Sequence, residues 1–308
     1  MTTKLSTRSS LQGAGLGFRR EMLDSFDEFN ISAVDFLEVA PENWLPVGGL
    51  MGRQFQQFTE KFPFVLHGLS LSIGGPAPLD EPFIRSIKAF MDKHQIELYS
   101  EHLSYCGDDG HLYDLMPIPF TEEAVEYVSA RIRRVQEIIE RPLIMENVSY
   151  YAAPGQEMDE ISFITQIMEK ADCRMLLDVN NVYVNSVNHR YDAKSYIDAM
   201  PTERISYLHM AGHFDEAEDL LVDTHGDDVK DTVWDLLTYT YEKHGVFPTL
   251  LERDFNIPPL NVLLREVDKI KQIQRAASTA VPETNTIPLS NKNGDIALSA
   301  TAVQATTN

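Results

Sequence analysis

The 308-residue chain is 43% hydrophobic, which is enough to bury a sizeable core within one main domain. Its 26 lysine and arginine residues face 47 aspartate and glutamate residues, a formal net charge of −21, so the chain repels nucleic-acid backbones and anionic membranes. The same charge would attract a basic peptide, although high solubility alone also explains it. We therefore expect no nucleic-acid partner and no membrane partner.

The sequence also predicts a cytoplasmic protein. Its two cysteines, Cys106 and Cys173, are too few for a disulfide scaffold. The opening stretch MTTKLSTRSSLQGAG has no apolar segment of the kind that secretory signal peptides carry. No stretch reaches the roughly 18 apolar residues that a transmembrane helix needs.

Short apolar runs bounded by turn residues recur along the chain and predict eight β-strands. In chain order they are Gly13–Phe18, Val34–Val39, Phe64–His67, Glu97–His102, Leu143–Asn147, Met175–Val179, Ile205–Met210 and Thr249–Glu252. Segments with the apolar spacing of helices lie between them: Glu21–Phe29, Phe55–Phe62, Phe83–His94, Glu122–Glu140, Ile161–Lys170 and Thr232–His244.

This alternation of strands and helices favours an α/β protein with a single (β/α)8 TIM barrel over residues 1–272. An open doubly wound sheet is the alternative. Such a sheet usually has a GxGxxG phosphate loop after its first strand, and the stretch GAGLGF lacks that spacing. From Ile273 onward the chain is rich in Ser, Thr, Ala, Asn and Pro, so we predict a disordered C-terminal tail over residues 273–308.

Polar side chains follow nearly every predicted strand, at the end where barrel enzymes build their active sites. They occur in FLEVAPEN, VLHG, YSEHLS, IMENVS, LLDVNN, YLHMAGH and TLLERD, and in the loop segment LVDTHGD. The candidate metal ligands among them are His67, His102, Glu146, Asp178, Asn181, His209, Asp223, His225 and Glu252. Closing the barrel would bring these side chains together.

Each of these residues alone has a simpler explanation, since a strand-end histidine is usually just hydrogen-bonded and Glu146 or Asp178 could cap a helix. Together they would crowd several acids with several imidazoles, and a buried carboxylate without a compensating charge costs several kcal/mol. Imidazole and carboxylate ligands without thiolate suit iron, manganese or zinc. So many ligands indicate two or three ions, bridged by Glu146 and Glu252, although a purely structural polar network is the alternative.

At these residues the sequence resembles the multinuclear non-heme iron-dependent oxidases, long described as domain of unknown function 692 or uncharacterised protein family 0276. This family includes the enzymes that modify methanobactin- and bufferin-type peptides. The resemblance covers nearly the whole chain before the tail. It is carried, in order, by GAGLGFR, VDFLEVAPENW, HGLSLSIGG, SEHLSY, MENVSYY, LLDVNNVYVN, YLHMAGH, DTHGD and LLERD.

The resemblance implies a xylose-isomerase-like barrel with two or three iron ions of mixed valence. Dioxygen would be the co-substrate, and cysteine residues of a ribosomally synthesised precursor peptide would be oxidised. The family also implies a partner protein that recruits the leader of that peptide.

Carried over by position, one iron would be held by His67 and His102, with Glu146 and Glu252 nearby. The same two glutamates would join Asp178 and His209 around a second iron, and a third would use Asn181, Asp223 and His225. The resemblance thus makes His67, His102, Glu146 and Glu252 the candidate catalytic residues.

Three other functions remain open at this point. Barrels resembling endonuclease IV bind metal ions, usually zinc, through the same residue types, but the acidic chain lacks the basic surface that duplex binding requires. A sugar isomerase would hold two ions mostly by carboxylates and place a lysine near the substrate. A catalytically silent scaffold that binds a peptide is the third, and metal analysis would separate it from the others.

Overall fold

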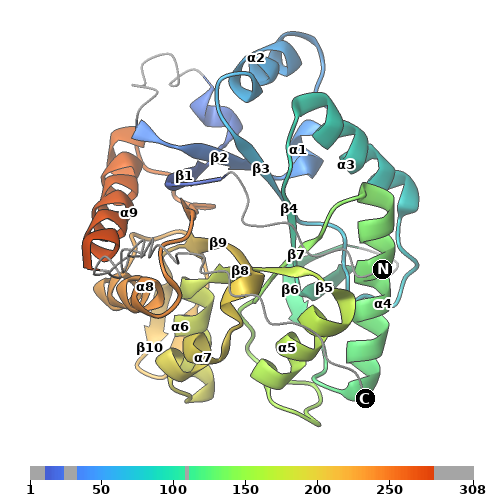
Figure 1. Ribbon diagram of the computed structural model, residues 1–308, viewed down its shortest axis with the longest axis vertical. Coiled ribbons are helices and arrows are strands. Elements are labelled where there is room, and N and C mark those ends of the chain that lie inside the picture. Colours follow the sequence, from blue (N-terminus) through green and yellow to red (C-terminus); the bar gives the residue numbers. More distant parts are fainter. Residues whose placement is uncertain (1–10, 24–32, 108–110, 281–308) are drawn as a thin grey trace, which may run out of the picture.

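The computed structural model describes residues 11–23, 33–107 and 111–280. Eight parallel strands form a closed barrel in the order β1-β12-β9-β8-β7-β4-β3-β2, with helices around it (Figure 1). The strands are β1 (Ala14–Gly17), β2 (Phe36–Val39), β3 (Phe64–Gly68), β4 (Tyr99–His102), β7 (Ile144–Glu146), β8 (Arg174–Asp178), β9 (Ile205–Met210) and β12 (Thr249–Leu251). The predicted TIM barrel is confirmed, and each predicted strand overlaps one barrel strand.

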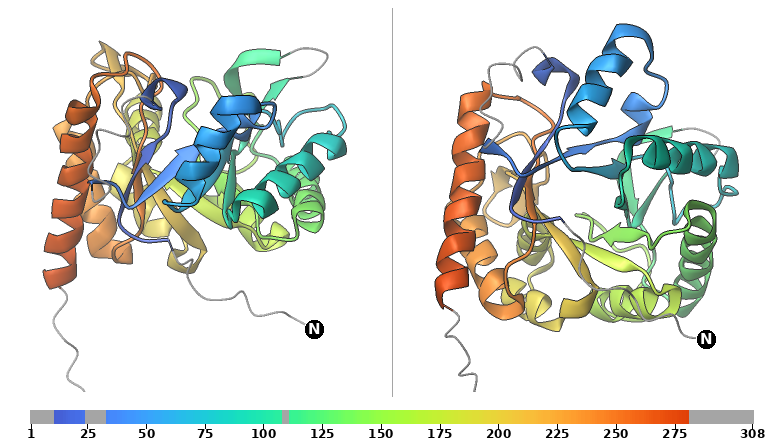
Figure 2. Two further views of the ribbon diagram at one scale, coloured as in Figure 1. Left: turned by 90° about the horizontal axis from the view of Figure 1, so that it is seen from above. Right: turned by 45° about the horizontal axis from the view of Figure 1, so that its top comes forward.

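The helices that cover the barrel follow its strands in the chain, and α9 comes after the last strand (Figures 1 and 2). Those that overlap predicted helices are α2 (Gly49–Thr59), α3 (Glu81–His94), α4 (Glu122–Ile139), α5 (Glu160–Ala171) and α8 (Asp231–His244). Helices that were not predicted are α1 (Pro41–Trp44), α6 (Val179–His189), α7 (Ala193–Ala199) and α9 (Leu260–Ala280). No helix within the described ranges combines the length and the apolar composition needed to cross a bilayer.

The first predicted helix, Glu21–Phe29, is only partly testable. A single 3-10 turn spans Arg20–Met22, and residues 24–32 lie outside the described part of the chain. Two hairpins were also missed: β5 (Ser104–Gly107) with β6 (His111–Pro117), and β10 (Phe214–Ala217) with β11 (Leu220–Val222). They follow β4 and β9, so both belong to the mouth of the barrel, and the β5–β6 hairpin projects beyond the strands in the left view of Figure 2.

Helix α9 continues past the predicted end of the barrel domain at residue 272. Ile273 and Ala277 pack against the core at helical spacing, and the buried Gln274 side chain donates hydrogen bonds to the carbonyls of Gly13 and Phe247 at 3.0 Å each. Residues 273–280 are therefore helical, which corrects the predicted start of the tail. The rest of the predicted tail, 281–308, lies outside the described residues.

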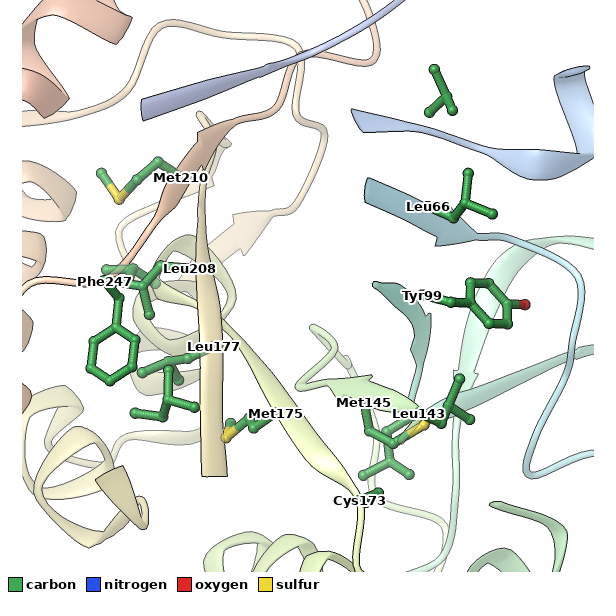
Figure 3. Packing of buried hydrophobic residues seen from close by; sticks show 14 of the residues in the cluster. Leu66, Tyr99, Leu143, Met145, Cys173, Met175, Leu177, Leu208, Met210 and Phe247 are labelled. Carbon is green, nitrogen blue, oxygen red and sulfur yellow. The ribbon is translucent and has the colours of Figure 1, made fainter. Parts of the chain in front are cut away.

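The alternation of side chains along each strand divides the core into two parts. Outward-facing residues such as Leu66, Met145, Leu177 and Leu208 pack towards the surrounding helices (Figure 3). Inward-facing residues form a separate cluster inside the barrel: Phe36, Val65, Ile144, Leu176, Tyr207 and Leu250, all fully buried. Strand β1 contributes Gly15 to this interior. A larger residue would not fit there, because a Cβ atom on Gly15 would lie 2.5 Å from the Phe36 ring.

A buried carboxyl group, that of Glu160, lies in the first turn of α5 between two tyrosines. The Tyr150 hydroxyl donates to Oε2 at 3.1 Å and the Tyr196 hydroxyl donates to Oε1 at 3.2 Å. Burial raises the pKa of Glu160 to about 7 from its ordinary value of 4.5, even though both hydrogen bonds act to lower it. The folded protein therefore keeps a proton on Glu160 at pH values where the unfolded chain has released it.

This raised pKa makes stability fall as the pH rises through about 7, because only the folded state then has to bury the charge. We expect Glu160→Gln to match the wild type at pH 5 and to exceed it at pH 8 by about 2 kcal/mol in free energy of unfolding. Urea unfolding at both pH values measures this, with the exposed Glu169→Gln on the same helix as control. A Glu160→Gln advantage that is equal at both pH values would contradict the prediction.

Candidate metal centre

The strand alternation that forms the inner apolar cluster also places the candidate site directly above it. Glu38, His67, Glu146, Asp178, His209 and Glu252 each follow an inner apolar or tyrosine residue by two positions, and His102 follows Ser100 in the same way. Residues two apart on a strand share a face, so these side chains point into the mouth of the barrel. All are buried except His102, which is partly exposed.

Glu146 lies at the centre of this group. Its Oε2 atom is 3.1 Å from His67 Nε2 and 3.2 Å from His102 Nε2, and the two histidine nitrogens are themselves 3.1 Å apart. Its Oε1 atom is 3.6 Å from His209 Nδ1 on the far side. One carboxylate thus faces histidines from three different strands.

Glu252 connects the barrel histidines with the loop that follows β9. Its Oε2 atom is 3.0 Å from His209 Nδ1 and 3.2 Å from His225 Nδ1. His225 Nε2 is in turn 2.9 Å from Asp223 Oδ1. The loop residues Asp223 and His225, which are distant from β12 in sequence, therefore reach the same site.

Asp178 and Asn181 complete the candidate set. Asp178 caps α6, because its Oδ1 atom accepts a hydrogen bond from the Asn181 backbone at 2.6 Å, and its Oδ2 atom remains 4.0 Å from His209 Nδ1. The Asn181 side chain donates to the Asn147 carbonyl at 3.1 Å. Capping and ligation are thus compatible, since each uses a different oxygen of Asp178.

Donor atoms without partners show that the arrangement fits metal ions. Buried side-chain atoms without a hydrogen-bond partner in the described part of the chain include Glu146 Oε2, Asp178 Oδ2, Asn181 Oδ1, His209 Nδ1 and His225 Nε2. One ligand atom from each of Glu146, Asp178, His209 and Glu252 lies within 4.8 Å of the others. Without a proton between them, a carboxylate oxygen and an imidazole lone pair at these distances repel each other, whereas a shared cation would satisfy both.

The pKa values of these groups also indicate that the carboxylates of the site favour bound protons or other cations. Burial acts to lower the pKa of His67, but attraction by Glu146 outweighs it and raises that pKa to about 9. Burial lowers the pKa of His102, and the neighbouring His67 charge lowers it further. Burial and then the charge of Glu146 raise the pKa of Asp178 to about 7. Without metal, protons therefore neutralise part of the carboxylate charge, and a metal ion would displace them.

The structure brings all nine predicted ligands to one end of the barrel, and it adds residues that the sequence reasoning did not select. Glu38 Oε2 lies 3.0 Å from His209 Nε2, and Asp254 Oδ2 lies 3.4 Å from His225 Nδ1. Arg19, from the loop after β1, pairs with Asp254 and lies 3.9 Å from Glu252. Glu38 was visible as a strand-end acid in FLEVAPEN, but no local pattern shows that it supports a histidine from the opposite side of the barrel.

Outer side chains orient the loop ligands. Asp223 accepts hydrogen bonds from the Asn180 amide and the Ser149 hydroxyl, both at 2.9 Å, and its backbone donates to the Tyr151 hydroxyl at 2.9 Å. His213 Nδ1 lies 2.8 Å from Asn180 Oδ1. His213 therefore supports Asn180 and, through it, Asp223.

The fold and this buried donor set define a TIM-barrel protein with a candidate metal centre at its mouth. Residues 13–275 match the family model described as "RiPP precursor modification enzyme MbnB/TglH/ChrH". The chain belongs to this family, whose members modify ribosomally synthesised peptide precursors. The resemblance stated from the motifs is thereby confirmed.

Similar proteins from other bacteria carry the family name UPF0276. A UPF0276 protein from Shewanella sediminis is 64% identical over 262 residues, covering 85% of this chain and 94% of its own length. UPF0276 proteins from Nitrosospira multiformis and Pseudomonas aeruginosa are 59% and 55% identical, covering 86% and 89% of this chain and 94% and 96% of their own lengths.

Solved structures with the same architecture are far more distant in sequence. D-psicose 3-epimerase from Clostridium cellulolyticum superimposes with a TM-score of 0.54 at 11% identity, covering 87% of this chain and 97% of the epimerase. Endonuclease IV from Thermus thermophilus has a TM-score of 0.54 at 14% identity, covering 87% and 99%. At such identities the similarity shows the xylose-isomerase-like fold alone.

Proposed function

We propose that this protein is a multinuclear iron enzyme that uses dioxygen to oxidise cysteine residues of a ribosomally synthesised precursor peptide. The observation that carries the proposal is the buried group of unpartnered carboxylate and imidazole atoms around Glu146, in a chain of the precursor-modifying family. Imidazole and carboxylate ligands suit iron. The proposal includes a partner protein that recruits the peptide leader, and a cytoplasmic location.

The candidate ligands would be distributed among the ions of that centre. His67 and His102 would hold one ion, Asp178 and His209 a second, and Asn181, Asp223 and His225 a third, while Glu146 and Glu252 join them. Bound iron would supply the one-electron chemistry with dioxygen and a binding position for a thiolate. The fully buried layer of Val65, Ile144, Leu176 and Leu250 lies beneath the site and closes it to water from below.

Features of the mouth support a peptide as substrate. Exposed large apolar side chains come from loops after five different barrel strands: Leu69, Met116, Tyr151, Phe214 and Phe255. Such exposed apolar groups around a polar centre are typical of a binding surface. The β10–β11 hairpin adds Asp215, Glu216, Glu218 and Asp219, which favour a substrate with basic residues.

Metal analysis is the first test of the proposal. Protein produced with added iron and purified without oxygen should contain more than one iron per chain by mass spectrometry. Stoichiometric zinc without iron would contradict the proposal and favour a hydrolase.

The second test searches the neighbouring genes for a short cysteine-containing peptide, which is then incubated with the iron-loaded protein and dioxygen. We expect its mass to change and the cysteine thiols to resist alkylation even after reduction, because the thiol has been converted rather than joined in a disulfide. The same assay without dioxygen is the control. Thiols that become fully alkylatable again after reduction would contradict cysteine oxidation beyond a disulfide.

A further inference from the structure

Three buried side chains connect His67 and His209 beneath the candidate metal centre. Ser100 Oγ lies 2.8 Å from His67 Nδ1 and 2.6 Å from the Tyr207 hydroxyl. The Tyr207 hydroxyl donates to Glu38 Oε2 at 2.9 Å, and the same Oε2 atom lies 3.0 Å from His209 Nε2. The histidines come from β3 and β9, so the chain of hydrogen bonds crosses the barrel interior.

The available hydrogens decide which atoms donate to Glu38 and to Ser100. A carboxylate only accepts, so His209 Nε2 and the Tyr207 hydroxyl both donate to Glu38. Tyr207 has no second hydrogen, and Ser100 donates its one hydrogen either to Tyr207 or to the Leu66 carbonyl, which lies 3.1 Å from Ser100 Oγ. Ser100 then has only lone pairs left for His67, so His67 Nδ1 carries the hydrogen.

This assignment of hydrogens determines which ring nitrogens face the centre without one. With its Nε2–H bound to Glu38, neutral His209 presents the lone pair of Nδ1, the atom 3.0 Å from Glu252 that has no hydrogen-bond partner in the described part of the chain. With its Nδ1–H bound to Ser100, neutral His67 presents the lone pair of Nε2, 3.1 Å from Glu146. A metal ion binds such a lone pair, and the hydrogen bond of the other nitrogen selects it.

We propose that Glu38 is a positioning residue that sets the tautomer of His209, while Ser100 sets that of His67. This inference rests on the metal centre of the proposed function, but not on iron or on the peptide. Glu38 is 4% exposed, and Ser100 and Tyr207 are fully buried, so water does not compete for these hydrogen bonds. Glu38 and Ser100 thus each orient one of the two histidines.

The test uses zinc alone as the metal and ¹⁵N-labelled histidine, whose NMR spectrum distinguishes the two tautomers. In the wild type we expect His209 to show a slowly exchanging Nε2–H and His67 an Nδ1–H. Glu38→Leu should abolish the His209 signal and weaken zinc binding 10- to 100-fold. The His67 signal should stay, because Ser100 can donate to the Leu66 carbonyl and still accept from His67 Nδ1.

Two conservative variants separate positioning from packing. Glu38→Gln keeps an oxygen acceptor and should restore the His209 signal and most of the zinc affinity. Ser100→Ala should leave the His209 signal in place and move only that of His67, which keeps the test decisive if Glu38→Leu fails to fold. Wild-type spectra and zinc affinity in Glu38→Leu, or an unmoved His67 signal in Ser100→Ala, would overturn the inference.

The outcome is independent of the oxidase proposal. A protein that binds zinc and shows these tautomer changes, but modifies no peptide, would refute the oxidase and support the role of Glu38. An active iron oxidase whose Glu38→Leu variant has wild-type spectra would do the reverse. If the chain binds neither metal, spectra of the metal-free protein still compare His209 Nε2–H in the wild type and the variants.

Discussion

Replacement of Glu146 by alanine should remove metal from the whole centre rather than from a single position. Its carboxylate contacts His67 and His102 through one oxygen and His209 through the other, so every ion bound by these histidines shares it. We expect metal affinity to fall by more than about 100-fold, beyond the 10- to 100-fold that loss of an outer-shell partner costs. Precursor oxidation should be lost with it.

The measurement for Glu146→Ala is metal per chain after dialysis against a chelator. Glu137→Ala, an exposed change on α4, is the matched control and should keep the wild-type content. Circular dichroism of the metal-free variants establishes that the barrel has formed. Wild-type metal content in Glu146→Ala would refute the bridging role and leave a structural polar network as the explanation of the site.

Gly212→Ala should selectively disrupt the loop that carries Asp223 and His225. A Cβ atom at position 212 would lie 2.1 Å from the Asp227 carbonyl oxygen and 2.5 Å from its carbon. These are backbone atoms and cannot rotate away, so the segment around Asp227 must move. We expect a loss of about 1–3 kcal/mol in stability, as for other overpacked positions, and displacement of His225 from Glu252.

Thermal unfolding and metal content together measure the effect of Gly212→Ala. The ion near Asp223 and His225 should be lost while the one near His67 and His102 stays, because the latter residues lie on strands that do not move. Gly48→Ala is the control, since a Cβ atom there meets nothing within 4 Å. A Gly212→Ala protein with full metal content and wild-type stability would contradict this account of the loop.

Local sequence patterns predicted the barrel and most of the polar side chains that lie at its mouth. An alternating strand places residues two apart on one face, so the pairs Val65 with His67 and Ile144 with Glu146 each follow from the sequence alone. The strand-end position of these polar residues then points to the mouth of a barrel. The family motifs supported the same interpretation, because they contain several of these residues.

Other features were not predicted from the sequence, because they do not produce a local pattern of apolar and polar residues. The β10–β11 hairpin was missed because all residues of Phe214–Ala217 are exposed and show no apolar alternation. The tail was predicted to begin too early because its composition resembles disorder, whereas Ile273, Gln274 and Ala277 use contacts with distant core residues to continue α9.

By itself, the sequence determined where the strands lie and which of their side chains share a face, since these depend on backbone geometry over a few residues. Only the tertiary structure decided which polar atoms meet. Closure of the barrel brings Glu38 of β2 to His209 of β9, and the loop after β9 brings His225 to Glu252. Such contacts join residues far apart in the chain, so they depend on the packing of the whole barrel and leave no local pattern.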